Sequence, residues 1–121
     1  MKIPGPDHPI TIAPAAERVR VMFNGEAVAD TTRALVLQEA AYKPVFYIPR
    51  EDAKLALLEK TAHGTHCPYK GDASYYSIKV GDRVAENAIW SYETPFPAVR
   101  EIESDLAFYP NRVDAIEVTP A

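Results

Sequence analysis

Hydrophobic and polar residues alternate with a period of two along several short stretches of the chain. Residues 18–23 read Arg-Val-Arg-Val-Met-Phe, and a returning stretch at 26–30 follows the dipeptide Asn24-Gly25. Such alternation is typical of a strand with one buried face, and Asn-Gly suits the positive φ angles of a tight hairpin turn. Residues 74–80 and 83–92, joined at Gly81-Asp82, predict a second hairpin.

The remaining patterns predict further short strands and little helix. β-branched and aromatic residues at 45–48 and 106–109 predict strands, as do residues 113–118. Residues 31–41 fit a strand with a bend or a short helix, and we favour the strand; residues 54–60 are ambiguous. Pro49 followed by acids at 51 and 52 predicts one helical turn, and residues 98–102 predict another. We therefore expect a mainly β protein: a single compact antiparallel β domain with one or two short helical turns.

The first sixteen residues differ from the rest in their proline content. Four of the eleven prolines lie there, at positions 4, 6, 9 and 14. Proline lacks a backbone donor and disfavours helix, so residues 1–16 predict an extended N-terminal arm and residues 17–121 the β domain. Ile10 and Ile12 could pack on that domain; the alternative is a poorly ordered terminus.

A weak internal repeat links the two predicted hairpins. Gly-x-x-Val-Ala followed by an acid occurs at 25–30 and again at 81–86. One interpretation is two β units folded against each other, with residues 67–71 as the link between them and a cleft at their interface. The alternative is that two hairpins share turn chemistry by chance.

The composition argues against several classes of function. The 121 residues are 47% apolar and 25% charged, as in an ordinary globular domain, and 13 basic against 17 acidic side chains give a net charge of −4. This balance argues against a nucleic-acid partner. No apolar run approaches a membrane span, and the N-terminus lacks the apolar core of a signal peptide. The single cysteine excludes an internal disulfide and fits a cytoplasmic location. We expect a monomer or homodimer.

The candidate chemistry centres on Cys67-Pro68-Tyr69-Lys70-Gly71. An ammonium beside a thiol lowers the pKa of that thiol and creates a nucleophile. In the alternative interpretation, Cys67 is a small buried apolar residue and Lys70 a surface charge. His63, His66 and Cys67 are possible zinc ligands, but closed zinc sites use four protein ligands, and Lys70 stands where the second cysteine of a Cys-x-x-Cys pair would be. We therefore expect no metal and no cofactor.

Aromatic residues supply the walls of a predicted cleft. Trp90 and Tyr92 are two apart and so share a strand face. If the Gly81 turn sets Val80 opposite Arg83, residue 75 faces residue 88 and Trp90 lies one diagonal step from Tyr75. The predicted cleft is therefore lined by Cys67, Lys70, Tyr75 and Trp90, with Tyr92 at its edge.

The residues around Cys67 also carry a family resemblance. Residues 67–71 with Ala73 and Tyr75-Tyr76, together with residues 25–30, 47–52, 88–92 and 106–109, resemble the domain of unknown function 427 family of small bacterial and fungal proteins. The resemblance implies a compact β fold, similar to the β-tent of cereblon-type ligand domains, and no settled activity. It also adds Asp52, which matches an acid of the family, at the edge of the cleft. The family is sometimes labelled nucleotidyltransferase-like, but the chain has no Walker-type loop and no Asp-x-Asp pair.

These observations favour a small-molecule-binding module over two alternatives. A flat or carbonyl-bearing ligand would stack on Trp90 or Tyr92 and meet the Lys70 ammonium. The first alternative is an enzyme that uses Cys67 as nucleophile, or Lys70 as an acid–base or Schiff-base group. The second is a protein-interaction domain that pairs through exposed strand edges.

Overall fold

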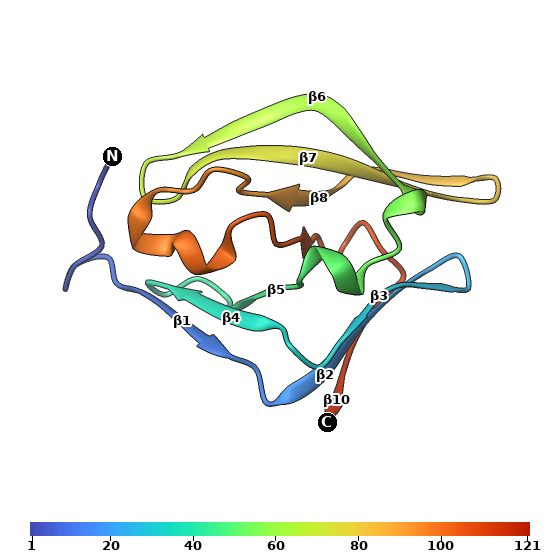
Figure 1. The fold of residues 1–121 in the computed structure, drawn as a ribbon, viewed down its shortest axis with the longest axis horizontal. Helices are drawn as coiled ribbons and strands as arrows, with labels where there is room; N and C mark the ends of the chain where they lie inside the picture. Colours follow the sequence, from blue (N-terminus) through green and yellow to red (C-terminus); the bar gives the residue numbers. More distant parts are fainter.

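The computed structural model describes residues 1–121 and confirms the mainly β prediction (Figure 1). No helix in it is long and apolar enough to cross a membrane. Its elements, with the short 3₁₀ helices labelled η, are β1 (Ile10–Pro14), β2 (Glu17–Phe23), β3 (Glu26–Thr31), β4 (Leu35–Glu39), β5 (Val45–Tyr47), η1 (Arg50–Asp52), η2 (Leu55–Leu57), β6 (Leu58–Cys67), β7 (Gly71–Val80), β8 (Arg83–Ser91), η3 (Pro97–Ile102), β9 (Ala107–Phe108) and β10 (Ala115–Pro120).

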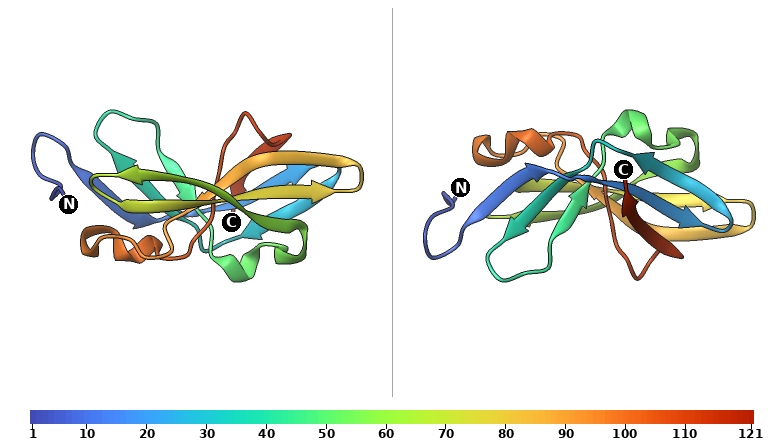
Figure 2. Two further views of the ribbon diagram at one scale, coloured as in Figure 1. Left: turned by 90° about the horizontal axis from the view of Figure 1, so that it is seen from above. Right: turned by 90° about the horizontal axis from the view of Figure 1, so that it is seen from below.

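The strands form three antiparallel sheets. Their orders are β1-β4-β5, β10-β2-β3 and β6-β7-β8-β9. Figure 1 shows β6, β7 and β8 along one side of the molecule, with β1, β2 and β4 along the other. In the views of Figure 2, the strands of the four-stranded sheet cross those of the other two at an angle. Ile48 and Leu106 exchange two backbone hydrogen bonds of 2.8 Å and so join the β5 sheet to the β9 sheet.

The two predicted hairpins are present, and their turns contact each other. Asn24 and Gly25 both have positive φ, 50° and 81°, as the tight turn between β2 and β3 requires. The Asn24 side-chain amide donates to the Val80 carbonyl oxygen at 2.9 Å, at the turn between β7 and β8. The ends of the two hairpins therefore lie together, although they are more than fifty residues apart in sequence.

Strand β10 closes the second sheet by pairing with β2. Val118 lies opposite Val19, and Ile116 opposite Val21. Arg20 donates to Glu117 at 3.0 Å on the exposed surface. The pattern of residues 113–118 predicted a strand but not its partner, which is almost a hundred residues away in the chain.

The segment around Cys67 differs from the prediction. Residues 58–67 form strand β6, and Cys67 lies opposite Gly71, so residues 68–70 are the turn of a β6–β7 hairpin. The interpretation of residues 67–71 as a link between two halves is therefore wrong: they join neighbouring strands of one sheet. The turn depends on Gly71, whose φ of 110° is rarely accessible to other residues.

The β7–β8 ladder contains a bulge that shifts its register by two residues. Val80 pairs with Arg83 as predicted, but the register shifts between Tyr76 and Ile78, and Tyr75 pairs with Trp90 rather than with residue 88. Asn87 lies in the bulge with φ of 49°, and its backbone N–H donates to the Ser77 hydroxyl oxygen at 3.0 Å. A shift of two preserves the faces, so Tyr75 and Trp90 share one face as predicted.

Two hydrophobic clusters fill the interior. The larger contains fifteen buried residues and packs β2 and β3 against β7 and β8. The smaller contains eight buried residues from β4, β5, β7, η3 and the chain after β8, among them Tyr47, Tyr75 and Tyr92. The smaller cluster positions the site described next.

Candidate ligand-binding site

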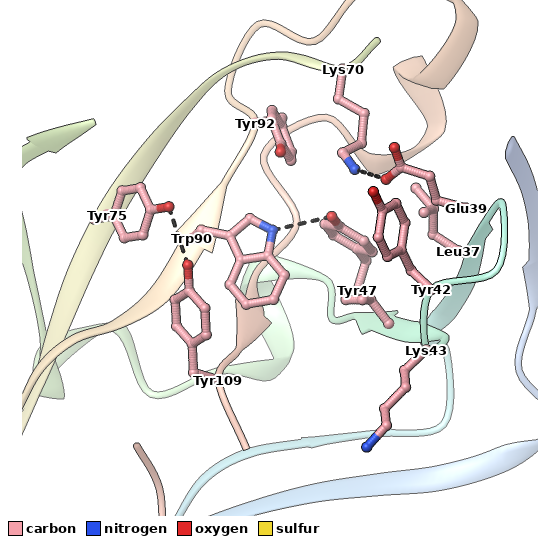
Figure 3. A pocket seen from close by; sticks show the side chains of 11 residues that line it. Leu37, Glu39, Tyr42, Lys43, Tyr47, Lys70, Tyr75, Trp90, Tyr92 and Tyr109 are labelled. Carbon is pink, nitrogen blue, oxygen red and sulfur yellow. Dashed lines mark hydrogen bonds and ion pairs between the residues drawn. The ribbon is translucent and has the colours of Figure 1, made fainter. Parts of the chain in front are cut away.

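A pocket of about 200 Å³ opens beside the smaller cluster, between the β4–β5 loop and the β7–β8 hairpin (Figure 3). Eight of its eleven lining residues are apolar or aromatic, and the others are charged. The lining residues are Leu37, Glu39, Tyr42, Lys43, Val45, Tyr47, Lys70, Tyr75, Trp90, Tyr92 and Tyr109.

Trp90 forms the centre of the aromatic wall. Its indole N–H donates to the Tyr47 hydroxyl oxygen at 3.2 Å, and its ring lies 4.5 Å from that of Tyr109. The Tyr75 and Tyr109 hydroxyls lie 3.2 Å apart in a hydrogen bond, and Thr65 is 3.0 Å from the Tyr75 hydroxyl. Burial and the bond to Tyr75 raise the pKa of Tyr109 to about 12. The wall is thus held by hydrogen bonds as well as by packing.

The polar end of the pocket is an ion pair between Lys70 and Glu39. The Lys70 ammonium bonds Glu39 Oε1, and His8 Nε2 lies 2.7 Å from Glu39 Oε2. The pair is largely shielded, since the Lys70 and Glu39 side chains are only 11% and 13% exposed. Burial opposes ionisation of Glu39, but hydrogen bonds from Lys70 and His8 outweigh it and hold the pKa of the carboxyl below its ordinary value.

The N-terminal residues pack over the turn that presents Lys70. The Lys2 N–H donates to the Pro68 carbonyl oxygen at 2.7 Å. The His8 ring stacks on Tyr69 at 4.0 Å with an angle of only 7° between the planes. Strand β1 then pairs with β4 and brings Ile10 opposite Glu39. Residues 2–14 therefore support both members of the ion pair.

Tyr92 provides an open hydrogen-bonding group. Its ring centroid is 5.8 Å from the Lys70 ammonium, and burial raises the pKa of its hydroxyl far above the ordinary value. The residue is 6% exposed and lines the pocket. No buried side-chain oxygen or nitrogen lacks a hydrogen-bond partner. The Tyr92 hydroxyl makes no hydrogen bond to the protein, so it is not among these buried atoms and is accessible from the pocket.

The structure brings together four of the six residues predicted for the cleft. Lys70, Tyr75, Trp90 and Tyr92 all line the pocket. Cys67 is half-buried and packs against the same cluster, but it is not a lining residue.

Asp52, the sixth predicted residue, lies away from the pocket. It ends η1, accepts a hydrogen bond from the Thr31 hydroxyl at 2.7 Å and pairs with Arg33 at 3.1 Å. These bonds give Asp52 a local structural role at the end of β3.

The histidines near Cys67 have other partners. His66 pairs with Asp72 at 2.7 Å on an exposed surface, and the His63 ring lies edge-on to Tyr75 at 4.4 Å. No three His, Cys, Asp or Glu side chains come close enough together to hold a metal ion. The contacts of His63 and His66 are therefore with Tyr75 and Asp72.

Glu39, Tyr42 and His8 are members of the site that the sequence did not predict. Glu39 and Tyr42 surround the β4–β5 turn, and His8 reaches the pair from the arm that the sequence predicted as extended. No local signal marks Glu39, because its partner is 31 residues away. Tyr47 and Tyr109 are two of many aromatic residues in the chain, and their spacing in the sequence does not place them in the aromatic wall of the pocket.

A second polar network lies on the opposite face of β7 and β8. Arg50 bonds the Tyr76 hydroxyl, the Ser91 hydroxyl and Glu93, each at 3.1 to 3.2 Å. Burial opposes ionisation of Glu93, but hydrogen bonds from Lys60, Tyr76 and Ser74 outweigh it and lower the pKa to about 2. Arg50 belongs to η1 and its partners lie on and after β7 and β8, so this network fixes η1 against the sheet.

A comparison with known families finds one match. A family described as a domain of unknown function, DUF427, matches residues 11–119, nearly the whole chain. No curated protein matches the chain. The match agrees with the resemblance seen around Cys67 and prescribes no reaction.

Proposed function

We propose that this chain, which belongs to the DUF427 family, is a small-molecule-binding protein whose ligand occupies the pocket beside Trp90. The observation that carries the proposal is the shielded Lys70–Glu39 pair at the end of an aromatic pocket that the Tyr92 hydroxyl also enters. A charged pair largely shielded from water is costly for stability alone, and the accessible hydroxyl beside it gives a ligand a hydrogen-bond partner.

The walls favour a flat ligand. Trp90 and Tyr47 meet edge to face at 89°, and Tyr109 is tilted by 51° against Trp90, so the pocket offers a flat ligand both ring faces and ring edges. The volume of about 200 Å³ is below the usual range for drug-sized ligands, which begins near ~300 Å³. The proposed ligand is therefore a single ring with small substituents.

The polar end favours a carbonyl or amide on that ring. The Lys70 ammonium has three donors and gives one of them to Glu39, so donors remain for a ligand oxygen. Tyr92 adds a second donor. Glu39 and Lys70 cancel in charge, so an uncharged polar group fits the pair better than a carboxylate, which Glu39 would repel.

The enzyme alternative receives less support. A Schiff-base lysine needs a free amine that can attack a carbonyl carbon, whereas the Lys70 side chain is paired with the Glu39 carboxylate. Cys67 lies outside the lining, and His66 is committed to Asp72. We extend the proposal to a cytoplasmic protein, since Cys67 is a free thiol, and to one without a nucleic-acid partner, since the net charge is −4.

The single tryptophan provides the test. Trp90 is the only indole in the chain, so one indole N–H cross-peak in a proton–nitrogen correlation spectrum reports on the pocket. We expect flat amides such as benzamide to shift this peak saturably, and Tyr92→Phe to weaken their binding roughly fivefold through the lost hydrogen bond. Tyr69→Phe removes a hydroxyl outside the pocket and is the matched control. If a panel of single-ring amides and imides leaves the peak unmoved, the proposed function is wrong.

A further inference from the structure

A second pocket of about 250 Å³ adjoins the first and is almost wholly apolar. It lies between β2, β5, β9 and β10, and its one charged lining residue is Lys43. The lining residues are Val19, Val21, Lys43, Pro44, Val45, Phe46, Ile48, Trp90, Phe108, Pro110 and Ile116.

Three residues line both pockets: Lys43, Val45 and Trp90. The indole of Trp90 is fixed by its bond to Tyr47, so its position between the two spaces is defined. Lys43 is exposed and makes no ion pair, and Figure 3 shows its ammonium pointing away from the Lys70 end of the first pocket. Trp90 is therefore the common wall, and Lys43 stands at the rim where the two pockets meet.

The two pockets differ in chemistry. The first contains the Lys70–Glu39 pair and several tyrosine hydroxyls, whereas aliphatic and aromatic side chains surround the second. Water in the second pocket would find few hydrogen-bond partners, so hydrocarbon is its favoured content. A polar pocket that shares Lys43, Val45 and Trp90 with an apolar pocket matches a molecule that has one polar and one apolar end.

We infer that the ligand is an amphiphile: a flat carbonyl-bearing head in the first pocket and a short hydrocarbon tail that passes Trp90 into the second. The inference rests on the proposed function and adds the chemical class of the ligand. The tail is buried against Val21 and Ile116, which face each other across β2 and β10. The Lys43 stem covers the crossing point while its ammonium stays in water.

Two probes test the inference: benzamide and 4-butylbenzamide. Each buried methylene contributes about 0.8 kcal/mol, or roughly fourfold in affinity, so a butyl tail half buried in the second pocket tightens binding at least tenfold. Both dissociation constants are measured from the Trp90 indole cross-peak.

Variants at Ile116 locate the tail. Ile116→Phe narrows the second pocket and Ile116→Gln makes its lining polar, so each removes most of the tail's gain and leaves benzamide affinity unchanged. Val118→Gln, on the same strand but outside the lining, is the matched control and keeps the gain. Should one Ile116 variant fold poorly, the other supplies the comparison.

The outcomes separate the two proposals. If benzamide binds but the butyl tail adds nothing, or its gain survives both Ile116 substitutions, the amphiphile inference is overturned while the first pocket stands. If neither benzamide nor its analogues bind the native protein, the proposed function itself fails.

Discussion

The Lys70–Glu39 pair permits a quantitative test of how strongly the pocket is shielded. We consider Lys70→Met, Glu39→Gln and the double variant. Lys70→Met leaves the Glu39 carboxylate with His8 as its remaining partner, at 2.7 Å. Glu39→Gln leaves the Lys70 ammonium shielded without an opposite charge. The double variant removes both charges and keeps side chains of similar length.

The expected losses follow from burial. Removing one partner of a fully buried pair costs about 3 to 5 kcal/mol, because the other charge stays uncompensated. The side chains here are 11% and 13% exposed, and His8 still serves Glu39, so we expect roughly 2 to 3 kcal/mol for each single variant. At about 2.1 cal/mol/K of unfolding entropy per residue, 121 residues convert this loss to a fall in Tm of roughly 8 to 12 °C. The double variant loses roughly 1 kcal/mol or less.

Urea unfolding, followed by circular dichroism and by Trp90 fluorescence, measures the free energy of unfolding of the native protein and of the three variants. Because the pKa of Glu39 lies below its ordinary value of 4.5, its contribution to the free energy of unfolding is complete above that pH and is lost as the pH falls further. The difference between the native protein and Glu39→Gln therefore narrows in acid. If all four proteins unfold within about 0.5 kcal/mol of one another at pH 7, water screens the pair and burial does not make its charges costly.

Three further predictions concern other sites. Glu93 has a pKa of about 2, so the native protein loses stability as the pH falls from 4.5 towards 2, whereas Glu93→Gln shows a flatter profile in acid urea titrations. Burial raises the pKa of Asp105 to about 6, so ionisation of its carboxyl destabilises the fold as the pH rises from 3.8 through 6. Asp105→Asn therefore adds roughly 1 kcal/mol to the free energy of unfolding at pH 8 and little at pH 4. Equal effects at the two pH values would contradict this. Gly71→Ala costs roughly 1 to 3 kcal/mol in urea denaturation because its φ of 110° is strained for any residue with a side chain. Gly64→Ala is the control and costs less, because a new methyl group at either position has a backbone atom at 3.5 Å but only Gly71 has positive φ.

Local signals predicted the hairpins well. The alternating residues of β2 and β3 flank the turn residues Asn24 and Gly25. Both indications come from residues that contact each other in the fold. The β10–β2 pairing has no such signal, since any alternating strand satisfies the pattern of residues 113–118. Strand β6 was hidden for a different reason: its side chains are mostly exposed, so residues 58–67 lack the apolar alternation that marks a half-buried strand.

Four of the six residues predicted for the cleft line the pocket, because the face of a strand on which a residue lies is less sensitive to error than the register of the strand. The bulge at Asn87 moved Trp90 from a diagonal position to one directly opposite Tyr75, yet a shift of two keeps every side chain on its face. Asparagine tolerates positive φ, so Asn87 was the available sign of the bulge. Lys70, Tyr75, Trp90 and Tyr92 therefore line one pocket, and their role as a ligand site stays a prediction.

The ion-pair partners of Lys70 and Asp52 could not be predicted from the sequence. Glu39 reaches Lys70 only after β1, β4 and the β6–β7 turn have been placed in three dimensions. Asp52 was assigned to the cleft by resemblance alone, and its nearest opposite charge, Arg33, holds it at the end of β3 instead. An acid in a short chain has many possible partners, and spacing does not choose among them.

The pairing of β10 with β2 has a kinetic consequence. Contacts between residues nearly a hundred positions apart require a large loop to close before they stabilise anything, so this pairing belongs to the late steps of folding. Until β10 pairs with it, β2 has unpaired backbone groups along one edge, beside Val19 and Val21. Partly folded chains therefore expose a template for intermolecular strand addition, and refolding yield should fall steeply with protein concentration.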